Sequence, residues 1–98
     1  MIEKSFLGDI ATYTFNRIAK IVLNDTVEIK DFVIKEVTES TVGMQYIVPV
    51  KSISLITKID IKDSNNKLIT SNNVYVPIYS DTLLLETINV REALKQNG

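Results

Sequence analysis

The segment ISLITKIDIK (residues 53–62) decides the fold class of this chain. Every second residue from Ile53 to Ile61 is apolar or threonine, while serine, lysine and aspartate occupy most of the positions between them. Successive side chains of a β-strand point to opposite faces, so this alternation predicts a strand with one buried face and one face in water.

The two-residue period extends back from this segment to position 21. Strands are predicted at 21–23, 27–37 and 42–50, because β-branched and aromatic residues gather there and turn-forming residues lie between them. We expect the three to be consecutive antiparallel neighbours. Asp31-Phe32 disturbs the alternation of the second strand and is interpreted as a bulge.

The period also continues toward the C-terminus. Asp63-Ser64-Asn65-Asn66 predicts a turn, because Asn and Asp tolerate left-handed backbone, and a short strand at 67–70 then completes a hairpin. A second turn is predicted at Asn72-Asn73, followed by strands at 74–78 and 82–90 and a frayed tail at 91–98. Proline cannot donate to a strand ladder, so Pro49 and Pro77 each indicate a sheet edge or a strand end.

The N-terminal region has a different period. Leu7, Ile10, Ala11, Thr14 and Ile18 recur at spacings of three and four, which predicts an amphipathic helix over about 2–19. The chain is therefore expected to be one α+β domain covering 1–98. This domain would place the helix on an edge or open face of a β-rich part at 20–90, where about seven antiparallel strands form a β-sandwich-like arrangement.

Composition excludes several classes of function. Eleven basic and twelve acidic residues give a net charge of −1, which argues against nucleic acid as a partner. No apolar run approaches the roughly 20 residues that cross a bilayer, and no secretory signal is evident, so we expect a soluble, cytosol-made protein. The chain has no histidine, no cysteine and only three glycines, so we expect no cofactor, no metal and no enzyme activity.

Two chemical alternatives stay open. A carboxylate pair could support catalysis if some of the acidic residues in the second half converged; these residues are Asp60, Asp63, Asp81, Glu86 and Glu92. Asp63 and Asn65 have the two-residue spacing of calcium-loop ligands, but the central glycine and closing glutamate are missing. An ordinary hairpin turn is the favoured interpretation.

Aromatic and proline residues supply the candidate interaction sites. Tyrosines suit interfaces because they combine an apolar ring with a polar hydroxyl, and three helix rings lie partly off the main apolar stripe. The candidates are Phe6, Tyr13, Phe15, Tyr46, Pro49, Tyr75, Pro77 and Tyr79. The competing interpretation is that these rings are wholly or partly buried in their own domain.

Six short segments carry a resemblance that spans nearly the whole chain: YIVPV (46–50), SLIT (54–57), DSNN (63–66), VYVPI (74–78), SDTLL (80–84) and INVRE (88–92). In their order after the helix they resemble short proteins from tail gene modules of long-tailed phages and prophages of Gram-positive bacteria. Such proteins sometimes carry an enzyme-like name, ketopantoate hydroxymethyltransferase. A chain of 98 residues cannot build the (β/α)₈ barrel of that enzyme, so the name implies no catalytic residues here.

The resemblance implies a non-catalytic structural or assembly protein of a phage or prophage tail, acting through protein–protein contacts near the tail tip or baseplate. Its expected partners are itself, as a homo-oligomer, and a larger phage tail protein. Its expected location is the cytoplasm of a bacterial host during assembly, or the virion tail. The alternative is a small β-sandwich module that binds a cell-surface carbohydrate or another small ligand through Tyr75 and Tyr79.

Overall fold

The computed structural model describes residues 4–90 of the chain. One helix precedes seven strands, and the bounds of these elements are α1 Lys4–Arg17, β1 Lys20–Leu23, β2 Val27–Ile29, β3 Ile34–Thr38, β4 Thr41–Val48, β5 Leu55–Lys62, β6 Leu68–Pro77 and β7 Thr82–Asn89. The α+β class, the strand number and the single N-terminal helix of the sequence-based prediction are confirmed.

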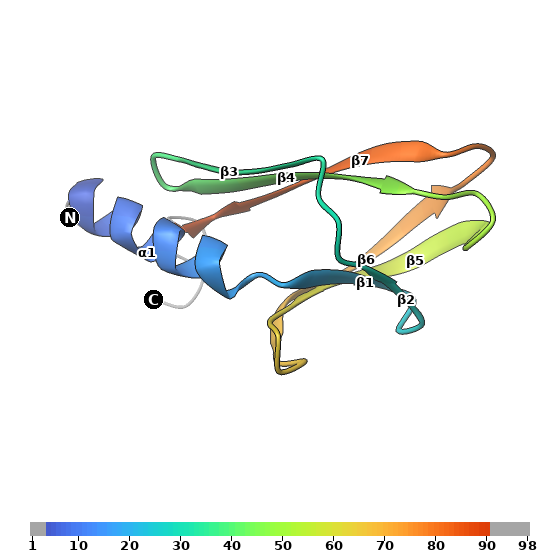
Figure 1. The fold of residues 1–98 in the computed structure, drawn as a ribbon, viewed down its shortest axis with the longest axis horizontal. Coiled ribbons are helices and arrows are strands. Elements are labelled where there is room, and N and C mark those ends of the chain that lie inside the picture. Colours follow the sequence, from blue (N-terminus) through green and yellow to red (C-terminus); the bar gives the residue numbers. More distant parts are fainter. Residues whose placement is uncertain (1–3, 91–98) are drawn as a thin grey trace.

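The strands form two sheets that face each other (Figure 1). A four-stranded sheet has the order β2-β1-β5-β6, a three-stranded sheet has the order β3-β4-β7, and all pairs are antiparallel. Helix α1 lies at one end of the sandwich, where it contacts β3 and β4. The architecture is therefore a small β-sandwich with one helix at its end.

The core lies between the sheets because alternate residues of both sheets point inward. In β4, Val42, Met44, Tyr46 and Val48 are buried, while the residues between them are more exposed. The inward residues of the facing sheet are Ile21, Leu23, Ile56, Ile59 and Ile61, and α1 adds Leu7 and Ala11 to the same cluster.

The strand predicted at 27–37 is wrong in one respect: it is two strands in different sheets. β2 pairs with β1 in the four-stranded sheet, whereas β3 pairs with β4 in the three-stranded sheet. Asp31-Phe32, interpreted as a bulge, lies in the segment that crosses between the sheets (Figure 1). The alternation is disturbed at this point because the chain changes sheet there. Strands β2 and β3 are therefore not neighbours.

The turn predicted at Asn72-Asn73 is also wrong, because β6 runs without a break from Leu68 to Pro77. The two asparagines pair with Ile59 and Lys58 of β5, next to a shift in register. The hairpin turn before β6 is confirmed: Asp63 Oδ1 accepts hydrogen bonds from the backbone N–H groups of Asn65 and Lys67, at 2.9 Å each. Ladder pairing thus overrode the turn propensity of the asparagines, whereas Asp63 formed the turn that its type favours.

The helix ends at Arg17, two residues before the predicted boundary, and its first predicted residues lie outside the described part of the chain, as does the predicted tail at 91–98. The Arg17 guanidinium donates to Asp63 Oδ2 and joins the end of α1 to the β5–β6 turn. Pro49 directly follows β4, and Pro77 ends the edge strand β6. Both proline positions agree with the prediction from sequence.

Candidate interaction surface

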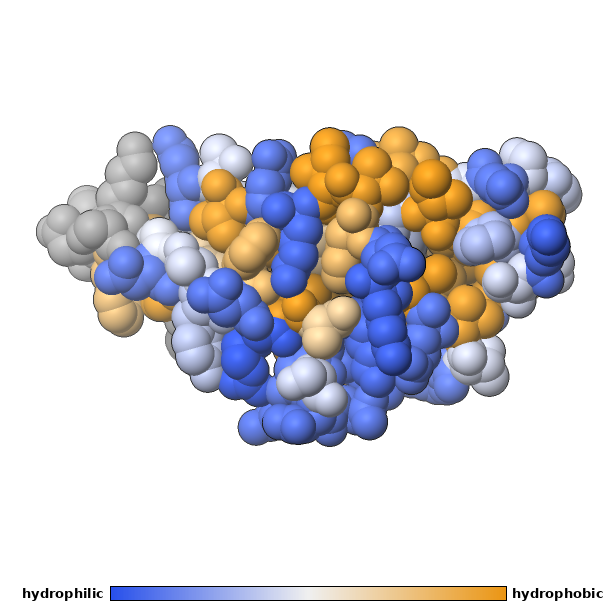
Figure 2. Space-filling view, in the orientation of Figure 1, coloured by the Kyte–Doolittle hydropathy of each residue, from blue (hydrophilic) through white to orange (hydrophobic). Residues whose placement is uncertain are grey.

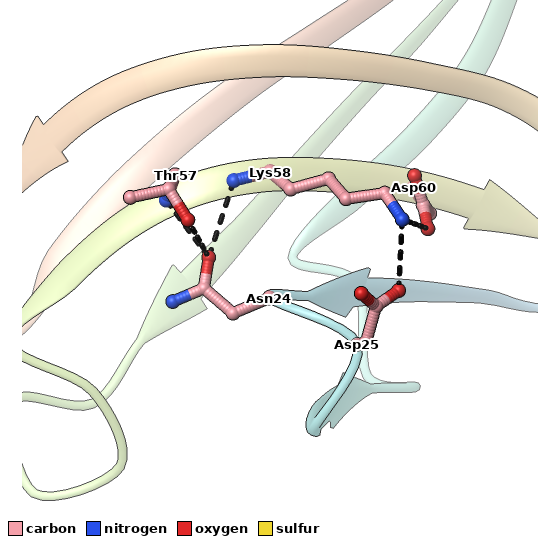
Figure 3. Close-up of polar contacts among 5 residues, drawn as sticks. All are labelled: Asn24, Asp25, Thr57, Lys58 and Asp60. Carbon is pink, nitrogen blue, oxygen red and sulfur yellow. Dashed lines mark hydrogen bonds and ion pairs between the residues drawn. The ribbon is translucent and has the colours of Figure 1, made fainter.

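The outer face of the four-stranded sheet is polar and is held by side-chain contacts within the sheet. The Asn24 side chain lies in the β1–β2 turn and links this turn to β5 (Figure 3). Its Oδ1 accepts hydrogen bonds from the backbone N–H groups of Thr57 at 2.8 Å and Lys58 at 3.1 Å, and its Nδ2 donates to the carbonyl of Leu55 at 2.8 Å. The Asn24 amide thereby joins the β1–β2 turn to Leu55, Thr57 and Lys58 of β5.

Lys58 extends this network between two carboxylates. Its Nζ lies 2.9 Å from Asp25 Oδ1 and 3.4 Å from Asp60 Oδ2 (Figure 3). The hydrogen bond to Asp25 and the charge of both carboxylates raise the pKa of Lys58. Lys20 and Glu28 form a further pair at 3.2 Å between β1 and β2, which lowers the pKa of Glu28. These charges are paired within the sheet, although Asp60 Oδ1 is buried without a hydrogen-bond partner.

The outer face of the three-stranded sheet is apolar toward the end where β4 ends and β7 begins. Leu83 and Leu85 of β7, Ile47 of β4 and Ile34 of β3 point outward and are exposed, with Leu85 the most exposed of them at 64%. Leu83 pairs with Ile47, and Gln45 lies between Ile34 and Leu85. We call these four side chains the outer apolar patch.

The outer apolar patch follows from the sequence of β7. The run Leu83-Leu84-Leu85 must place leucine on both faces of a strand, and Leu84 takes the inward position. Among the outward residues of the three strands, only Glu36 carries a charge. Hydrophobic side chains accordingly gather along the margin over this sheet in Figure 2. A contiguous apolar patch on the order of several hundred Å² often marks a contact surface.

A shallow pocket of about 340 Å³ adjoins the patch. It lies where the chain crosses from β2 to β3 beside the end of β4, and its apolar lining residues are Ile29, Phe32, Val33, Ile47 and Pro49. Ile47 belongs to both the pocket and the patch, so the apolar surface continues around this corner of the sandwich.

The inward face of β7 carries a carboxylate. Glu86 is half-buried, and its Oε1 accepts a hydrogen bond of 3.3 Å from the Tyr46 hydroxyl. Burial raises the pKa of Glu86, and burial with the nearby Glu86 charge raises the pKa of Tyr46 far above its ordinary value. The one charged residue of β7 therefore points away from the outer apolar patch.

The candidate residues chosen from the sequence do not form one site. Tyr46 is fully buried, so it must be removed from the interaction residues; its inward position in β4 is the reason. Phe15 packs against the core, with Lys35 Nζ 4.6 Å from its ring centre.

The other candidates are on the surface but on different elements. Phe6 and Tyr13 are exposed on α1, and Tyr75 and Tyr79 lie on either side of Pro77. The patch residues Ile34, Ile47, Leu83 and Leu85 were missed. The run of three leucines at 83–85, within the strand predicted at 82–90, was the feature of the sequence that could have identified Leu83 and Leu85.

The carboxylates considered for catalysis have separate partners. Asp63 binds Arg17, Asp81 accepts a hydrogen bond from the backbone N–H of Val50, Asp60 lies beside Lys58, and Glu86 is bonded by Tyr46. Glu92 lies outside the described residues. Within residues 4–90, no group of three or more acidic, histidine or cysteine side chains could hold a metal ion.

In the part of the chain that the structure describes, the helix lacks the length and apolar character needed to cross a membrane. Comparison with protein-family models, with curated proteins and with solved structures finds no match.

Proposed function

We propose that this protein is a non-catalytic assembly component of a phage or prophage tail and that it acts through protein–protein contacts of its three-stranded sheet. The observation that supports this most is the outer apolar patch of Ile34, Ile47, Leu83 and Leu85 on an otherwise ordinary small sandwich. Partners bury such patches, whereas a site for a small substrate is usually concave with a few convergent polar groups.

The chemistry of the acidic side chains agrees with this proposal. The four carboxylates considered for catalysis that lie within the described residues each make a structural contact, and the chain offers neither histidine nor cysteine as a nucleophile partner or general base. The tail assignment itself comes from the sequence resemblance, and it adds the class of partner: the chain's own copies or a larger tail protein.

The test is a comparison of surface variants in binding assays. Light scattering after size-exclusion chromatography, over a hundredfold range of concentration, would give the mass of the purified protein. Pairwise binding to the products of neighbouring tail genes would give its partners. We expect Leu83→Ser to weaken self-association or tail-protein binding, whereas Leu68→Ser should not. Leu68 is a suitable control because it is equally exposed, at 53% against 50%, but lies in the other sheet.

An unchanged affinity in Leu83→Ser would contradict the role of this face. A protein that stayed monomeric and bound no tail protein would contradict the proposal as a whole.

A second candidate function is supported by the tyrosines beside Pro77. Tyr75 and Tyr79 are 76% and 89% exposed, and solvent-exposed tyrosine rings are suited to stacking on sugars. In this case, Tyr75→Ala and Tyr79→Ala should abolish binding to cell-wall glycans and leave the fold intact. Equal glycan binding by wild type and both variants would remove this candidate.

A further inference from the structure

Strand β7 lies at an edge of the three-stranded sheet. Among the described residues, its only strand neighbour is β4. The Val90 N–H donates to the Ser40 carbonyl at 2.9 Å, and this contact continues the register that pairs Thr41 with Asn89. Hydrogen-bonded pairs alternate in antiparallel ladders, so even-numbered residues of β7 bond to β4. The backbone N–H and C=O groups of Leu83, Leu85 and Thr87 therefore point away from β4.

The opposite sheet blocks its own edge at the corresponding place. The Ile78 N–H donates to the Ser54 carbonyl, so the neighbouring position 77 points away from β5, and proline occupies it. A proline there has no N–H to offer to an added strand. The remaining edge strands are short: β2 has three residues, and β3 has five, including Lys35 and Glu36.

Strand β7 has none of these protections. Its eight residues include no proline and no lysine, and its single charge, Glu86, points inward. Of the two long edge strands in residues 4–90, β6 ends in a proline and has two register shifts against β5, so β7 is the one that offers a regular edge to another strand.

We propose that two copies of the chain pair through β7, antiparallel about a twofold axis at Leu85, and join their three-stranded sheets into one six-stranded sheet. This inference rests on the proposed function and names its partner as a second copy. An axis at Leu85 places Leu85 opposite Leu85 and Leu83 opposite Thr87. The backbone N–H and C=O groups of these residues point away from β4, so they can form hydrogen bonds with the second copy.

The side chains of β7 favour this register. On the outer face, Leu85 meets Leu85 and Leu83 meets Thr87; on the inner face, Leu84 meets Glu86. An axis at Glu86 would place two carboxylates directly opposite each other, which is unfavourable. An axis at Leu84 would pair only the five residues Thr82–Glu86, against the seven of Thr82–Ile88 for Leu85.

The size of the contact sets the strength expected of the dimer. The seven paired residues at about 3.4 Å each give a contact about 24 Å long, and the molecule is 24–25 Å across. The footprint is thus at most about 600 Å² per copy, at the low end of specific interfaces, where weak and transient contacts lie. We expect a reversible dimer.

Cysteine crosslinking tests the register directly, because the chain has no cysteine of its own. In the proposed dimer, the Leu85 Cα atoms are about 5.5 Å apart, within the range that a disulfide spans. Mild oxidation should convert Leu85→Cys to a covalent dimer. Leu83→Cys and Thr87→Cys should not crosslink alone, but a mixture of the two should. Ile47→Cys, exposed on the same face in the next strand, is the control and should form no covalent dimer.

Other outcomes would overturn the register or the dimer. Efficient crosslinking of Leu84→Cys or Glu86→Cys instead would place the axis elsewhere. A wild-type dimer by light scattering without crosslinking of Leu85→Cys would show that another surface is used, and the proposed assembly function would stand. A wild-type monomer that binds a tail protein would also overturn the dimer alone.

A noncovalent variant gives a second readout. Leu85→Lys places two ammonium groups opposite each other and should raise the dissociation constant by about tenfold or more. The position is exposed, so folding should persist, and circular dichroism would verify this. An unchanged dissociation constant in the folded variant would contradict the pairing.

Discussion

The two sheets have opposite outer faces. On the four-stranded sheet, Asn24 and Lys58 form hydrogen bonds and ion pairs with neighbouring residues of the chain. On the three-stranded sheet, Leu83 and Leu85 are apolar and exposed, and the adjacent edge has backbone groups without a strand partner among the described residues. The contacts on the first face stabilise the fold, and we propose that the second face serves association. Substitutions on the first should therefore change stability, whereas substitutions on the second should change assembly.

Asn24→Ala should have the largest effect on stability. It removes an acceptor of three hydrogen bonds, from the Thr57 and Lys58 backbone N–H groups and the Thr57 hydroxyl, and a donor to the Leu55 carbonyl, and it places alanine at a φ of 53°. Four lost hydrogen bonds and a left-handed alanine together cost about 4 kcal/mol of unfolding free energy. Urea denaturation would measure this loss.

Asn24→Gly is the matched control, because glycine accepts the positive φ but restores no hydrogen bond. We expect it to be destabilised less than Asn24→Ala. Equal stability of wild type and Asn24→Ala would contradict the view that this face holds the sheet together.

Asp63→Asn should have a smaller, pH-dependent effect. The Arg17 guanidinium and two backbone N–H groups favour the carboxylate and lower the pKa of Asp63. Because the folded pKa lies below the unfolded value, this contribution is complete above the unfolded pKa and is lost as the pH falls through the folded pKa. The stability difference between wild type and Asp63→Asn should thus shrink toward low pH. Thermal unfolding across the acidic range would measure it.

Asp9→Asn is a control for removing one carboxylate, since Asp9 is exposed on the helix that also carries Arg17. A stability difference that stayed constant with pH for Asp63→Asn would count against the role of its ion pair.

Most of the fold followed from local patterns, and the errors occurred where two patterns compete. The alternation at 53–62 and the turn at Asp63 correctly located β5 and the hairpin. The continuous period at 27–37 hid a change of sheet, because strands of both sheets have the same two-residue period. At Asn72-Asn73 the composition favoured a turn, but pairing with β5 kept the chain extended.

The candidate interaction surface was harder to predict than the fold. Aromatic type selected Tyr46, but type does not reveal which face of a strand a residue occupies, and Tyr46 points into the core. The outer apolar patch combines three strands, and β7 joins β4 across about 40 residues of sequence. Strand order fixes that combination, and strand order was not predictable from one sequence.

Glu86→Gln should change stability less than Asp63→Asn and with the opposite dependence on pH. Burial raises the pKa of Glu86, so the folded state holds its proton to higher pH than the unfolded state does. The wild type therefore loses stability as the pH rises from the unfolded pKa through the folded one. Glu86→Gln removes this loss and should be the more stable protein at about pH 7, by less than about 1 kcal/mol.

Denaturation of Glu86→Gln and wild type at about pH 4 and about pH 7 would measure the two differences. Tyr46→Phe provides a second check, because it removes the hydroxyl that donates to Glu86. A wild type that became more stable relative to Glu86→Gln as the pH rose would contradict the inward, partly desolvated position of this carboxylate.

The smallest effect on monomer stability is expected for the double variant Leu83→Ser/Leu85→Ser. Both side chains are exposed, and exposed positions usually change the free energy of unfolding by no more than about 0.5 kcal/mol each. Urea denaturation at the lowest workable protein concentration would isolate the monomer, because association adds stability in proportion to the logarithm of concentration. At high concentration the wild type should gain stability that the double variant lacks. A double variant that was strongly destabilised even at low concentration would show that the two leucines serve the fold, and the contrast between the two outer faces would disappear.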